Sequence, residues 1–241
     1  MEKTEFLYEG KAKQIFATEA SDLIIVRYKD DATAFNGEKK SSINNKGVLN
    51  NKITEIFFKK MTEAGIPNHF IKRLDDREQL CKKVSIVPLE FVVRNLVAGS
   101  MAKRLAIEEG YQPSNVIYDI CYKKDELGDP LINDHHAVAL GAASYEELSV
   151  MYELTRRINE LLKTIADAMG VILVDFKIEF GKDAQGNIIL ADEISPDTAR
   201  FWDKITMKKL DKDRFRRDLG DVEEAYVEIL ERLEKAVELK D

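Results

Sequence analysis

The chain of 241 residues is predicted to adopt an α+β fold, with antiparallel strand pairs and a few amphipathic helices. Two observations predict it. Strand-like runs come in pairs around turn residues, at 5–18 and again at 171–194. Two long segments, 144–169 and 222–239, carry apolar residues every three or four positions, which is typical of amphipathic helices. The hydrophobic content of 44% is enough for a sizeable core, and the length suits one large domain or two small lobes that share a cleft.

The first third of the chain is predicted to be mostly strand, with one helix over 50–64. Apolar residues from Ile53 to Met61 fall on one stripe of that helix, and Gly65 follows it as a stop signal. Residues 30–45 are polar, with Asn36-Gly37 as a turn signal. The predicted strands cover 5–18 (two strands around Gly10), 23–28, 70–74 and 80–97 (two strands around Pro88).

The rest of the chain alternates between helices and strands. Ser144 and Glu147 have the spacing of a capping box at the start of the helix over 144–169. Ser100 is predicted to cap a shorter helix that runs to about residue 109. The densely charged segment 203–219 predicts a stretch that is solvated or binds an anion. The predicted strands are 116–123, followed by a polar loop at 124–133, and then 171–180 and 188–194, which are joined by a turn.

The strand over 171–180 has an unusual pattern of charge. Side chains on a strand alternate between its two faces, so Asp175, Lys177 and Glu179 share one face, and the apolar residues 176, 178 and 180 point into the core. Asp192, near the end of the returning strand, would come close to Glu179 or Lys177 in a suitable register. Two carboxylates can hold Mg²⁺, and a lysine between them can neutralise charge on a transferring phosphoryl group. The alternative is a solvated hairpin face with cross-strand ion pairs.

Two further segments are candidates for binding phosphate. The turn Gly10-Lys11-Ala12-Lys13 could place lysines over a nucleotide, although it lacks the Walker pattern, and a turn that merely carries lysines is the alternative. Arg94 ends an apolar strand, and the helix start predicted at Ser100 offers free backbone N–H groups. Arg94, Ser100 and Lys103 or Arg104 therefore form a candidate phosphate pocket, with an ordinary capped helix and surface bases as the alternative.

Composition and charge argue against several classes of protein. The net charge of −7 disfavours a protein that works mainly through nucleic-acid contacts, although local lysines and arginines can still bind anionic substrates. We expect no signal peptide, and no apolar run approaches the ~18 residues that span a membrane. Cys81 and Cys121 are expected to be free thiols in a reducing cytoplasm. His135 and His136 lack partners at zinc-ligand spacing, so we expect a loop that borders a substrate.

Four motifs occur in a characteristic order and spacing. They are GKAK at 10–13, PLEFVVRN followed by LVAGSMAKR at 88–104, DFKIEFG at 175–181, and DEISPDTARFWD at 192–203. Together they resemble the phosphoribosylaminoimidazole-succinocarboxamide synthase (SAICAR synthetase) family of purine biosynthesis. The resemblance runs from about residue 7 to the last helix, and the two later motifs are long and specific.

The resemblance implies an ATP-grasp-like, kinase-related fold of two lobes with a nucleotide cleft between them. A small lobe with an antiparallel sheet, residues 1–87, would cover the nucleotide, and a larger α+β lobe, residues 88–241, would hold the metal and the second substrate. The implied reaction joins the carboxylate of 5-amino-1-(5-phosphoribosyl)imidazole-4-carboxylate (CAIR) to the amine of L-aspartate, while ATP becomes ADP and phosphate. The resemblance also implies a Mg²⁺ cofactor, a cytoplasmic location and a homodimer.

The same resemblance implies roles for individual residues. Glu179 and Asp192 would bind Mg²⁺, and Lys177 and Asp175 would act at the reacting carboxylate of CAIR. Arg94, Ser100 and Arg200 would hold the phosphate of CAIR, while Glu90 and Asp197 would line its imidazole and carboxylate. The implied ATP-binding residues are Lys11, Ala12, Lys13, Lys123 and the adenine-binding segment 82–86, which begins at Lys82 and ends at Ile86.

Two other functions stay open on the sequence. A small-molecule kinase on the related scaffold would use the same acids and lysines, but it needs a base for a hydroxyl acceptor, and the sequence lacks an HRD-like loop. A non-catalytic nucleotide-sensing module would need neither both metal carboxylates nor a separate arginine–serine pocket. Release of ADP with each candidate acceptor, with and without L-aspartate, separates the three functions.

Overall fold

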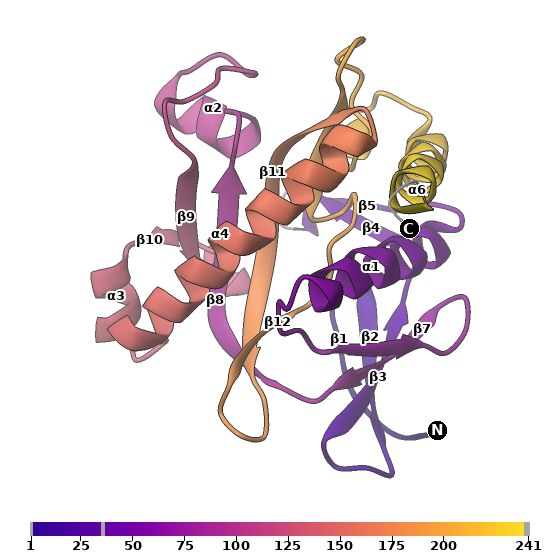
Figure 1. Cartoon of the computed structure of the whole chain (residues 1–241), viewed down its shortest axis with the longest axis vertical. Coiled ribbons are helices and arrows are strands. Elements are labelled where there is room, and N and C mark those ends of the chain that lie inside the picture. Colours follow the sequence, from indigo (N-terminus) through magenta and orange to yellow (C-terminus); the bar gives the residue numbers. More distant parts are fainter. Residues whose placement is uncertain (1, 35–36, 239–241) are drawn as a thin grey trace.

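The computed structural model describes residues 2–34 and 37–238 and confirms the predicted α+β class. One sheet has five strands in the order β1-β2-β3-β7-β6, and a second sheet has the order β10-β9-β8-β11-β12, with β13 also paired to β11 (Figure 1). The strands of the first sheet are β1 (Lys3–Glu9), β2 (Lys13–Thr18), β3 (Leu23–Tyr28), β6 (Phe70–Arg73) and β7 (Glu78–Lys82). Those of the second are β8 (Ser85–Arg94), β9 (Ile117–Tyr122), β10 (Leu131–Ile132), β11 (Val171–Lys182), β12 (Ile188–Ala191) and β13 (Ala199–Asp203).

The N-terminal strands follow the prediction, and the polar segment 30–45 contains a strand pair; Asn36 of its turn signal lies outside the described residues. Strands β4 (Asp31–Ala34) and β5 (Lys39–Ser42) form a separate two-stranded antiparallel sheet. Polar strands of four residues show little alternation of apolar side chains, so the sequence pattern did not indicate them. Helix α1 (Lys46–Glu63) also begins earlier than predicted, directly after Asn45, which has a left-handed φ of 57°.

The sequence predicted two strands that meet around Pro88, but the structure has one continuous strand there. The break lies before Ser85, and β8 continues through Pro88 to Arg94. The register of β8 with β11 shifts between the pairs Glu179–Glu90 and Gly181–Ile86, so Pro88 lies at an irregularity where no ladder N–H is required. The carbonyl of Pro88 accepts a hydrogen bond from the Lys123 N–H at 3.0 Å.

The segment after β8 also differs from its prediction. Helix α2 (Gly99–Leu105) is shorter than predicted, and Ala98 occupies the N-cap position, so Ser100 lies inside the first turn and does not cap the helix. The polar loop at 124–133 contains a short 3₁₀ helix, η2 (Asp125–Leu127), and strand β10. Residues 134–136 begin helix α3 (Asp134–Ala139) rather than a loop.

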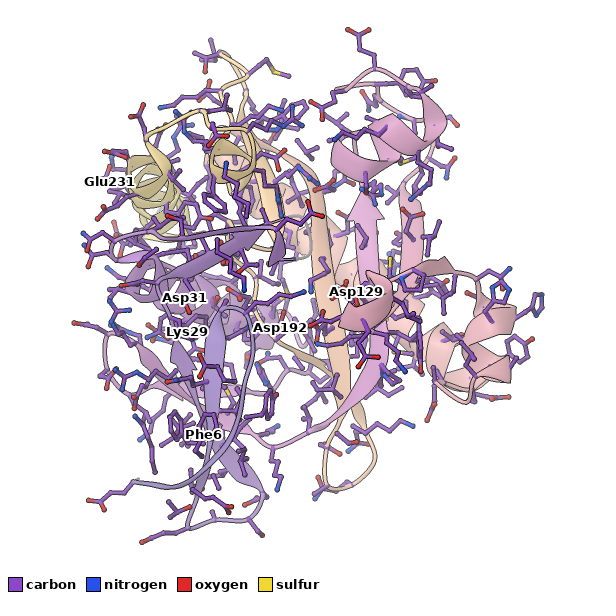
Figure 2. All side chains as sticks on the ribbon, turned by 180° about the vertical axis from the view of Figure 1, so that it is seen from behind. Phe6, Lys29, Asp31, Asp129, Asp192 and Glu231 are labelled. Carbon is purple, nitrogen blue, oxygen red and sulfur yellow. The ribbon has the colours of Figure 1, made fainter. Side chains whose placement is uncertain are left out.

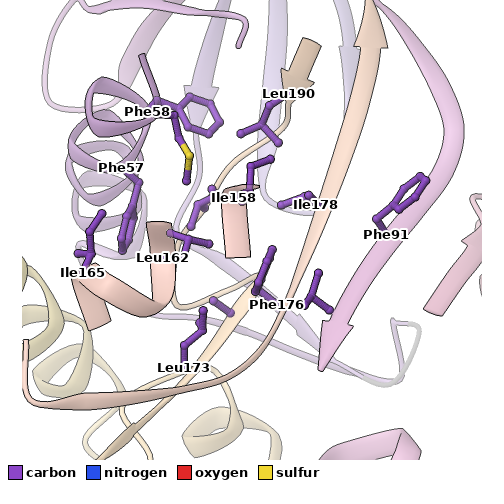
Figure 3. Close-up of a cluster of buried hydrophobic side chains, with 14 of the residues drawn as sticks. Phe57, Phe58, Phe91, Ile158, Leu162, Ile165, Leu173, Phe176, Ile178 and Leu190 are labelled. Carbon is purple, nitrogen blue, oxygen red and sulfur yellow. The ribbon is translucent and has the colours of Figure 1, made fainter. Parts of the chain in front are cut away.

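Three helices cover one face of the six-stranded sheet. They are α1, α4 (Tyr145–Ala168) and α6 (Val222–Glu238), and they share one hydrophobic core with β8, β11 and β12 (Figure 1). The predicted capping box of Ser144 and Glu147 is present at the start of α4. On β11, Phe176 and Ile178 point into this core as predicted, at 1% and 0% exposure, beside side chains of α1 and α4 (Figure 3).

The charged segment 203–219 is not solvated throughout, in contrast to the prediction. Asp211 is fully buried and Asp213, the first residue of helix α5 (Asp213–Arg216), is 1% exposed. Asp211 accepts hydrogen bonds from the N–H groups of Phe201 and Asp213, at 3.0 and 2.7 Å. Asp211 and Asp213 therefore have partners inside the protein, whereas Lys204, Lys208 and Asp218 of the same segment are exposed.

Two connections join the sheets. The chain passes from the five-stranded sheet to the six-stranded sheet between β7 and β8, and the segment before β6 pairs with β12 through hydrogen bonds between His69 and Leu190 and between Leu190 and Pro67, both of 2.9 Å. Cys81 is buried and Cys121 half-buried, and both are free thiols, as predicted. Across the described residues, no helix has the length and apolar character needed to span a membrane.

Candidate active site

The charged face of β11 lies opposite the helices, and it is largely buried. Asp175 and Glu179 are each 3% exposed, while the side chain of Lys177 is 31% exposed. The alternative interpretation was a solvated hairpin face with cross-strand ion pairs. The ion pairs are present, but the face is not solvated. Figure 2 views the molecule from behind and shows Asp192 between the N-terminal strands and β11.

Lys177 lies between two glutamates. Its Nζ is 2.6 Å from Oε1 of Glu90 on β8 and 3.2 Å from Oε1 of Glu179. Glu90 and Glu179 are directly opposite each other across the strands, where two like charges repel unless a cation lies between them. Lys123 binds the second carboxylate oxygen of Glu179. The sequence-predicted residues Lys177, Glu179, Glu90 and Lys123 are therefore one contiguous cluster.

The protonation of this cluster follows from its burial and charge. Burial opposes the charged form of Lys177, but the carboxylates of Glu179, Asp192 and Glu90 outweigh it and raise the lysine pKa above its usual range. Burial raises the pKa of Glu90, against the lowering effect of Lys177. Lys177 is therefore a fixed ammonium group throughout the physiological pH range.

Asp192 takes up the position that the hairpin predicted. Ala191 is paired with Glu179, and Asp192 follows it with a left-handed backbone φ of 62°. Lys13 binds the carboxylate of Asp192 and lies 3.0 Å from that of Glu193. Burial alone would raise the pKa of Asp192, but the charges of Lys13 and Lys177 hold it below its ordinary range. Asp192 is therefore an ionised carboxylate close to the Glu179 cluster.

His69 supports the backbone of Asp192 and was not expected from the sequence. Its Nε2 lies 3.2 Å from the carbonyl oxygen of Asp192, and its ring is 5% exposed. Burial and then the charge of Lys13 lower the pKa of His69 to about 4. A neutral imidazole that donates from Nε2 fits this contact. No sequence pattern connected His69 with Asp192, because their hydrogen bond depends on the pairing of the two sheets.

The donor set of Glu179 and Asp192 fits one kind of metal site. Within residues 2–34 and 37–238, no group of three or more His, Cys, Asp and Glu side chains is arranged to hold a metal ion. Mg²⁺, however, often takes one or two carboxylates from the protein and completes its ligands with water and substrate phosphate. Both carboxylates already attract cations, namely the ammonium groups of Lys123 and Lys13. The residues therefore suit Mg²⁺ that arrives with a nucleotide phosphate.

A second cluster lies at the other end of β11, around Asp175. Arg200 on β13 places Nη1 2.8 Å from Oδ2 of Asp175, and Arg94 on β8 places Nη1 3.4 Å from the same oxygen. Nη2 of Arg94 lies 3.5 Å from the Ser100 hydroxyl oxygen. The structure thus brings together Arg94, Ser100 and Arg200, the three residues predicted to hold a phosphate.

Gly99 allows Arg200 to approach the start of α2. Its φ is +56°, and a Cβ at this position would lie 2.5 Å from Nη2 of Arg200. Any other residue would therefore displace the guanidinium group and strain the backbone. The sequence left open whether Lys103 or Arg104 belongs to the phosphate pocket. Arg104 forms an ion pair with Asp119, which also binds Arg94, whereas Lys103 makes no ion pair with any described residue.

Two aspartates that orient the arginines were not predicted. Oδ2 of Asp119 on β9 lies 2.7 Å from Nε of Arg94, and Oδ2 of Asp213 lies 2.9 Å from Nε of Arg200. Burial opposes the charge of Arg200, but Asp175 and Asp213 raise its pKa above the usual value. Asp119 could have been noticed in the sequence as a single acidic residue in an otherwise apolar strand. Nothing in the sequence distinguishes Asp213 from the other charged residues of its segment.

Asp197 lies in a separate buried cluster. Its carboxylate is 2.7 Å from Nζ of Lys46 on α1 and 2.6 Å from the hydroxyl of Tyr226 on α6. Lys46 is 1% exposed, so this is a buried ion pair, in which either group would be costly to leave alone. No contact within the described part of the chain joins Asp197 to Glu90, and Lys46 was not expected from the sequence.

The remaining predicted nucleotide residues lie on the five-stranded sheet and its exit. Nζ of Lys11 is 2.8 Å from Asp125, whereas Lys13 is directed to Asp192, so the two lysines of the turn diverge. The carbonyl of Ala12 accepts a hydrogen bond from the Lys29 N–H at 2.8 Å. Residues 82–86 run from Lys82 at the end of β7 to Ile86 near the start of β8, and thus lead from one sheet to the other.

The adjacent histidines take part in local structure. His136 forms a capping box with Asn133 at the start of α3, and Nδ1 of His135 lies 2.6 Å from the hydroxyl of Tyr145. Both contacts lie around α3, which follows β10, the edge strand of the six-stranded sheet (Figure 1). His135 and His136 are therefore both engaged in contacts at the starts of α3 and α4.

Comparison with known proteins agrees with the motifs. The SAICAR synthetase family model matches residues 6–233. A phosphoribosylaminoimidazole-succinocarboxamide synthase of Fusobacterium nucleatum is 62% identical over 233 residues, which make up 97% of this chain and 98% of that protein. The crystal structure of such a synthase from Ehrlichia chaffeensis has a TM-score of 0.94 and 46% identity, and the match covers 96% of this chain and 99% of the other.

A SAICAR synthetase solved in complex with ADP has a TM-score of 0.92 and 51% identity, with coverage of 95% of this chain and 97% of that one. These likenesses confirm the predicted two-lobed, ATP-grasp-like α+β fold. The sequence motifs, the extent of the family match and the shared fold lead to one conclusion. The chain belongs to the SAICAR synthetase family.

Proposed function

We propose that this protein is an ATP-dependent carbon–nitrogen ligase of purine biosynthesis that joins the carboxylate of CAIR to the amine of L-aspartate. The products are SAICAR, ADP and phosphate. Family membership supports the reaction, and one feature of the site supports its placement. Strand β11 carries an arginine cluster at Asp175, a lysine at Lys177 and a carboxylate cluster at Glu179, in that order. Two anionic substrates could thus meet at Lys177.

The arginine cluster is the proposed site of the CAIR phosphate. Arg94 and Arg200 offer two guanidinium groups, and Ser100 offers a hydroxyl, within one partly buried group. Guanidinium groups bind phosphate in a fork geometry. Asp119 accepts a hydrogen bond from Nε of Arg94, and Asp213 accepts one from Nε of Arg200, so both guanidinium groups are held in position. Glu90, beside Lys177, and Asp197 are the proposed contacts of the imidazole ring.

The carboxylate cluster is the proposed site of MgATP. Glu179 and Asp192 would hold Mg²⁺, and Lys11, Ala12, Lys13 and Lys123 would bind the phosphates, with the adenine at 82–86. Mg²⁺ held by these two carboxylates would supply positive charge to the nucleotide phosphates. Lys13 and Lys123, which contact Asp192 and Glu179, are the cations beside these carboxylates that would bind the phosphates.

Lys177 would act on the reacting carboxylate. A carboxylate is a poor electrophile, because it is charged and lacks a leaving group. Transfer of the γ-phosphoryl group of ATP to a carboxylate oxygen of CAIR breaks the bond to ADP and creates that leaving group. The deprotonated amine of L-aspartate then attacks the carbonyl carbon, the C–N bond forms, a proton leaves the nitrogen and phosphate departs. The ammonium of Lys177 would stabilise the charge on the carboxylate oxygens throughout.

The proposed location is the cytoplasm, and the proposed assembly is a homodimer. The free thiols of Cys81 and Cys121 suit a reducing compartment. Strand β1 is an edge strand in which Phe6 and Tyr8 are 51% and 56% exposed, and an exposed apolar edge is a surface that a second copy could cover. Light scattering after size-exclusion chromatography measures the assembly, and a monomeric mass at micromolar concentration would contradict a stable dimer.

Release of ADP tests the reaction. Purified protein with MgATP should release ADP only when CAIR and L-aspartate are both present, and mass spectrometry should detect SAICAR in equal amount. A kinase on this scaffold would release ADP with its acceptor alone, and a sensing module would release none. Either of those outcomes would contradict the proposed ligase activity.

A further inference from the structure

A cavity of about 560 Å³ lies between strand β9 and helices α3 and α4, and none of the residues proposed for the ligase reaction lines it (Figure 1). Three tyrosines line it, Tyr118 from β9 and Tyr145 and Tyr152 from α4. Tyr118 packs against the hydrophobic core, whereas its neighbour Asp119 binds Arg94. Successive side chains of a strand point to opposite faces, so the cavity lies on the helix-covered face of the sheet and the proposed active site on the other. Its volume is typical of a small-molecule site.

Aromatic rings form the walls of this cavity. The ring centroids of Tyr118 and Tyr152 are 6.2 Å apart and their planes are at 81°, so the two rings meet as walls at nearly a right angle. The third ring, Tyr145, is 50% exposed, and its hydroxyl lies 2.6 Å from Nδ1 of His135. Burial raises the pKa of Tyr118 and of Tyr152, so both phenols stay neutral. The faces of neutral aromatic rings carry partial negative charge and attract a cation within about 6 Å of the ring centroid.

The charged side chains of the lining favour a cation as well. Asp134 on α3 accepts a hydrogen bond from the Tyr152 hydroxyl at 2.6 Å and forms no ion pair with any residue in the described ranges. Arg156 is the one basic residue of the described lining. Its Nη2 lies 2.7 Å from Oε1 of Glu153, and its Nη1 lies 2.6 Å from Oε1 of Glu160. Two carboxylates thus compensate this guanidinium, and the charge left over around the cavity is negative.

This combination suits an organic cation better than an anion or a metal ion. An anion such as a nucleotide would need a free basic group, and Arg156 already binds two glutamates. A metal ion needs several oxygen or nitrogen ligands, and the described part of the chain has no group of three or more His, Cys, Asp and Glu side chains arranged to hold one. An organic ammonium ion needs apolar contact and a counter-charge. The tyrosine rings and the buried Leu148 supply the contact, and Asp134 supplies the charge.

We propose that this cavity binds a small organic ammonium ion, with the rings of Tyr118, Tyr145 and Tyr152 around the cation and Asp134 as its counter-ion. The site goes beyond the proposed ligase function and does not depend on it, because the two lie on opposite faces of the sheet. Choline is a suitable probe, since its trimethylammonium group is a cation of the kind that aromatic rings bind. The alcohol in which a tert-butyl group replaces the trimethylammonium group has the same shape without the charge, and it is the matched control ligand.

Saturation-transfer NMR on the full chain tests the site. Choline should bind saturably, with a Kd roughly 3- to 30-fold below that of the uncharged alcohol, as expected for one or more cation–π contacts. Putrescine, which carries primary ammonium groups, should compete with choline. Neither MgATP nor CAIR should displace choline, because their proposed sites are on the other face of the sheet.

Two variants locate the binding. Tyr145→Leu removes a half-exposed ring and should raise the Kd of choline roughly 3- to 30-fold. Asp134→Asn removes the counter-charge but keeps an acceptor for the Tyr152 hydroxyl, and it should weaken choline several-fold while leaving the uncharged alcohol unaffected. Because it is isosteric, it still tests the site if Tyr145→Leu fails to fold. Tyr111→Leu is the matched control, since Tyr111 is 56% exposed and lies outside the cavity lining.

Several results would overturn the proposal. Absence of saturable choline binding, or equal binding of choline and the uncharged alcohol, would show that the cavity does not select a cation. An unchanged Kd in both Tyr145→Leu and Asp134→Asn, or displacement of choline by MgATP or CAIR, would place the binding elsewhere. None of these results bears on the ligase reaction, which release of ADP tests separately.

Discussion

Replacement of Lys177 by methionine separates a chemical role from a structural one. The Lys177 ammonium is 2.6 Å from Glu90 and 3.2 Å from Glu179, so the residue stabilises two facing carboxylates whatever else it does. Methionine keeps much of the aliphatic bulk and deletes only the charge. If the lysine stabilises charge on the reacting carboxylate, its loss should appear in kcat, whereas loss of uniform binding would appear in KM.

The expected magnitudes differ for turnover and stability. Loss of one preorganised electrostatic contact lowers kcat by roughly 10²–10³-fold, so we expect at least about 10²-fold, with little change in the KM of ATP. The buried carboxylates of Glu90 and Glu179 would lose their shared cation, at a cost of about 1–3 kcal/mol. This lowers the melting temperature by roughly 2–4 °C per kcal/mol. Uptake of a proton by Glu90, whose pKa burial already raises, would relieve part of the loss.

Because both roles predict a lower melting temperature, kcat decides between them. Lys182→Met is the matched control: this lysine is on the same strand but on its other face, where its Nζ lies 2.5 Å from Glu147 of α4, and the pair is 38% and 30% exposed. Such surface pairs contribute about 0–1 kcal/mol, so both kcat and the melting temperature should stay near normal. A Lys177→Met protein that melts early but turns over at the wild-type rate would refute the proposed chemistry.

Three further predictions concern the metal, the phosphate and acid stability. Glu179→Gln or Asp192→Asn should lower turnover by roughly 10²-fold or more in a folded protein, and normal turnover of both at limiting Mg²⁺ would exclude them as ligands. Arg94→Ala should raise the KM of CAIR far more than that of ATP, and Ser100→Ala should do so more mildly; equal effects on the two substrates would mean that the pocket is misplaced. His69 has a pKa of about 4 when folded, below its ordinary 6.5, so the unfolded chain binds the proton more readily and stability falls as the pH drops from 6.5 towards 4. Urea unfolding of His69→Gln at pH 7 and 5 should show about 2 kcal/mol less loss than the wild type, and an equal loss in both would argue against this origin.

Local patterns predicted much of the fold. The alternation along β11 and the apolar stripe of α4 depend only on neighbouring residues, and both were confirmed. Strand β13 was missed because Ser195, Pro196 and Asp197 favour turns and only five strand residues follow. Its pairing with β11, through an irregular register, is what brings Arg200 to Asp175. Periodicity within one segment carries no information on such a pairing.

The sequence pointed to candidate residues that the structure brings together where they stand in long motifs, but it did not reveal the contacts that support them. Asp213 is drawn from a segment whose many charges suggested solvent exposure, yet it is buried against Arg200. The pair of Lys46 and Asp197 likewise joins the start of α1 to a loop more than half the chain away. A charged residue looks the same in sequence whether water or a buried partner compensates it, because the partner is supplied by tertiary structure.

Helix α1 bears on how the chain can be synthesised. Although α1 belongs to the N-terminal part, its apolar side packs in the core of the six-stranded sheet, and the ring of Phe57 is stacked on that of Phe201 at 6.3 Å. The core of the six-stranded sheet is therefore complete only when α1 contributes to it. On the ribosome, α1 emerges long before β11 and β13, and its apolar side stays uncovered until the last third of the chain appears. Nascent chains that stall before Phe201 would expose this surface to chaperones or to aggregation.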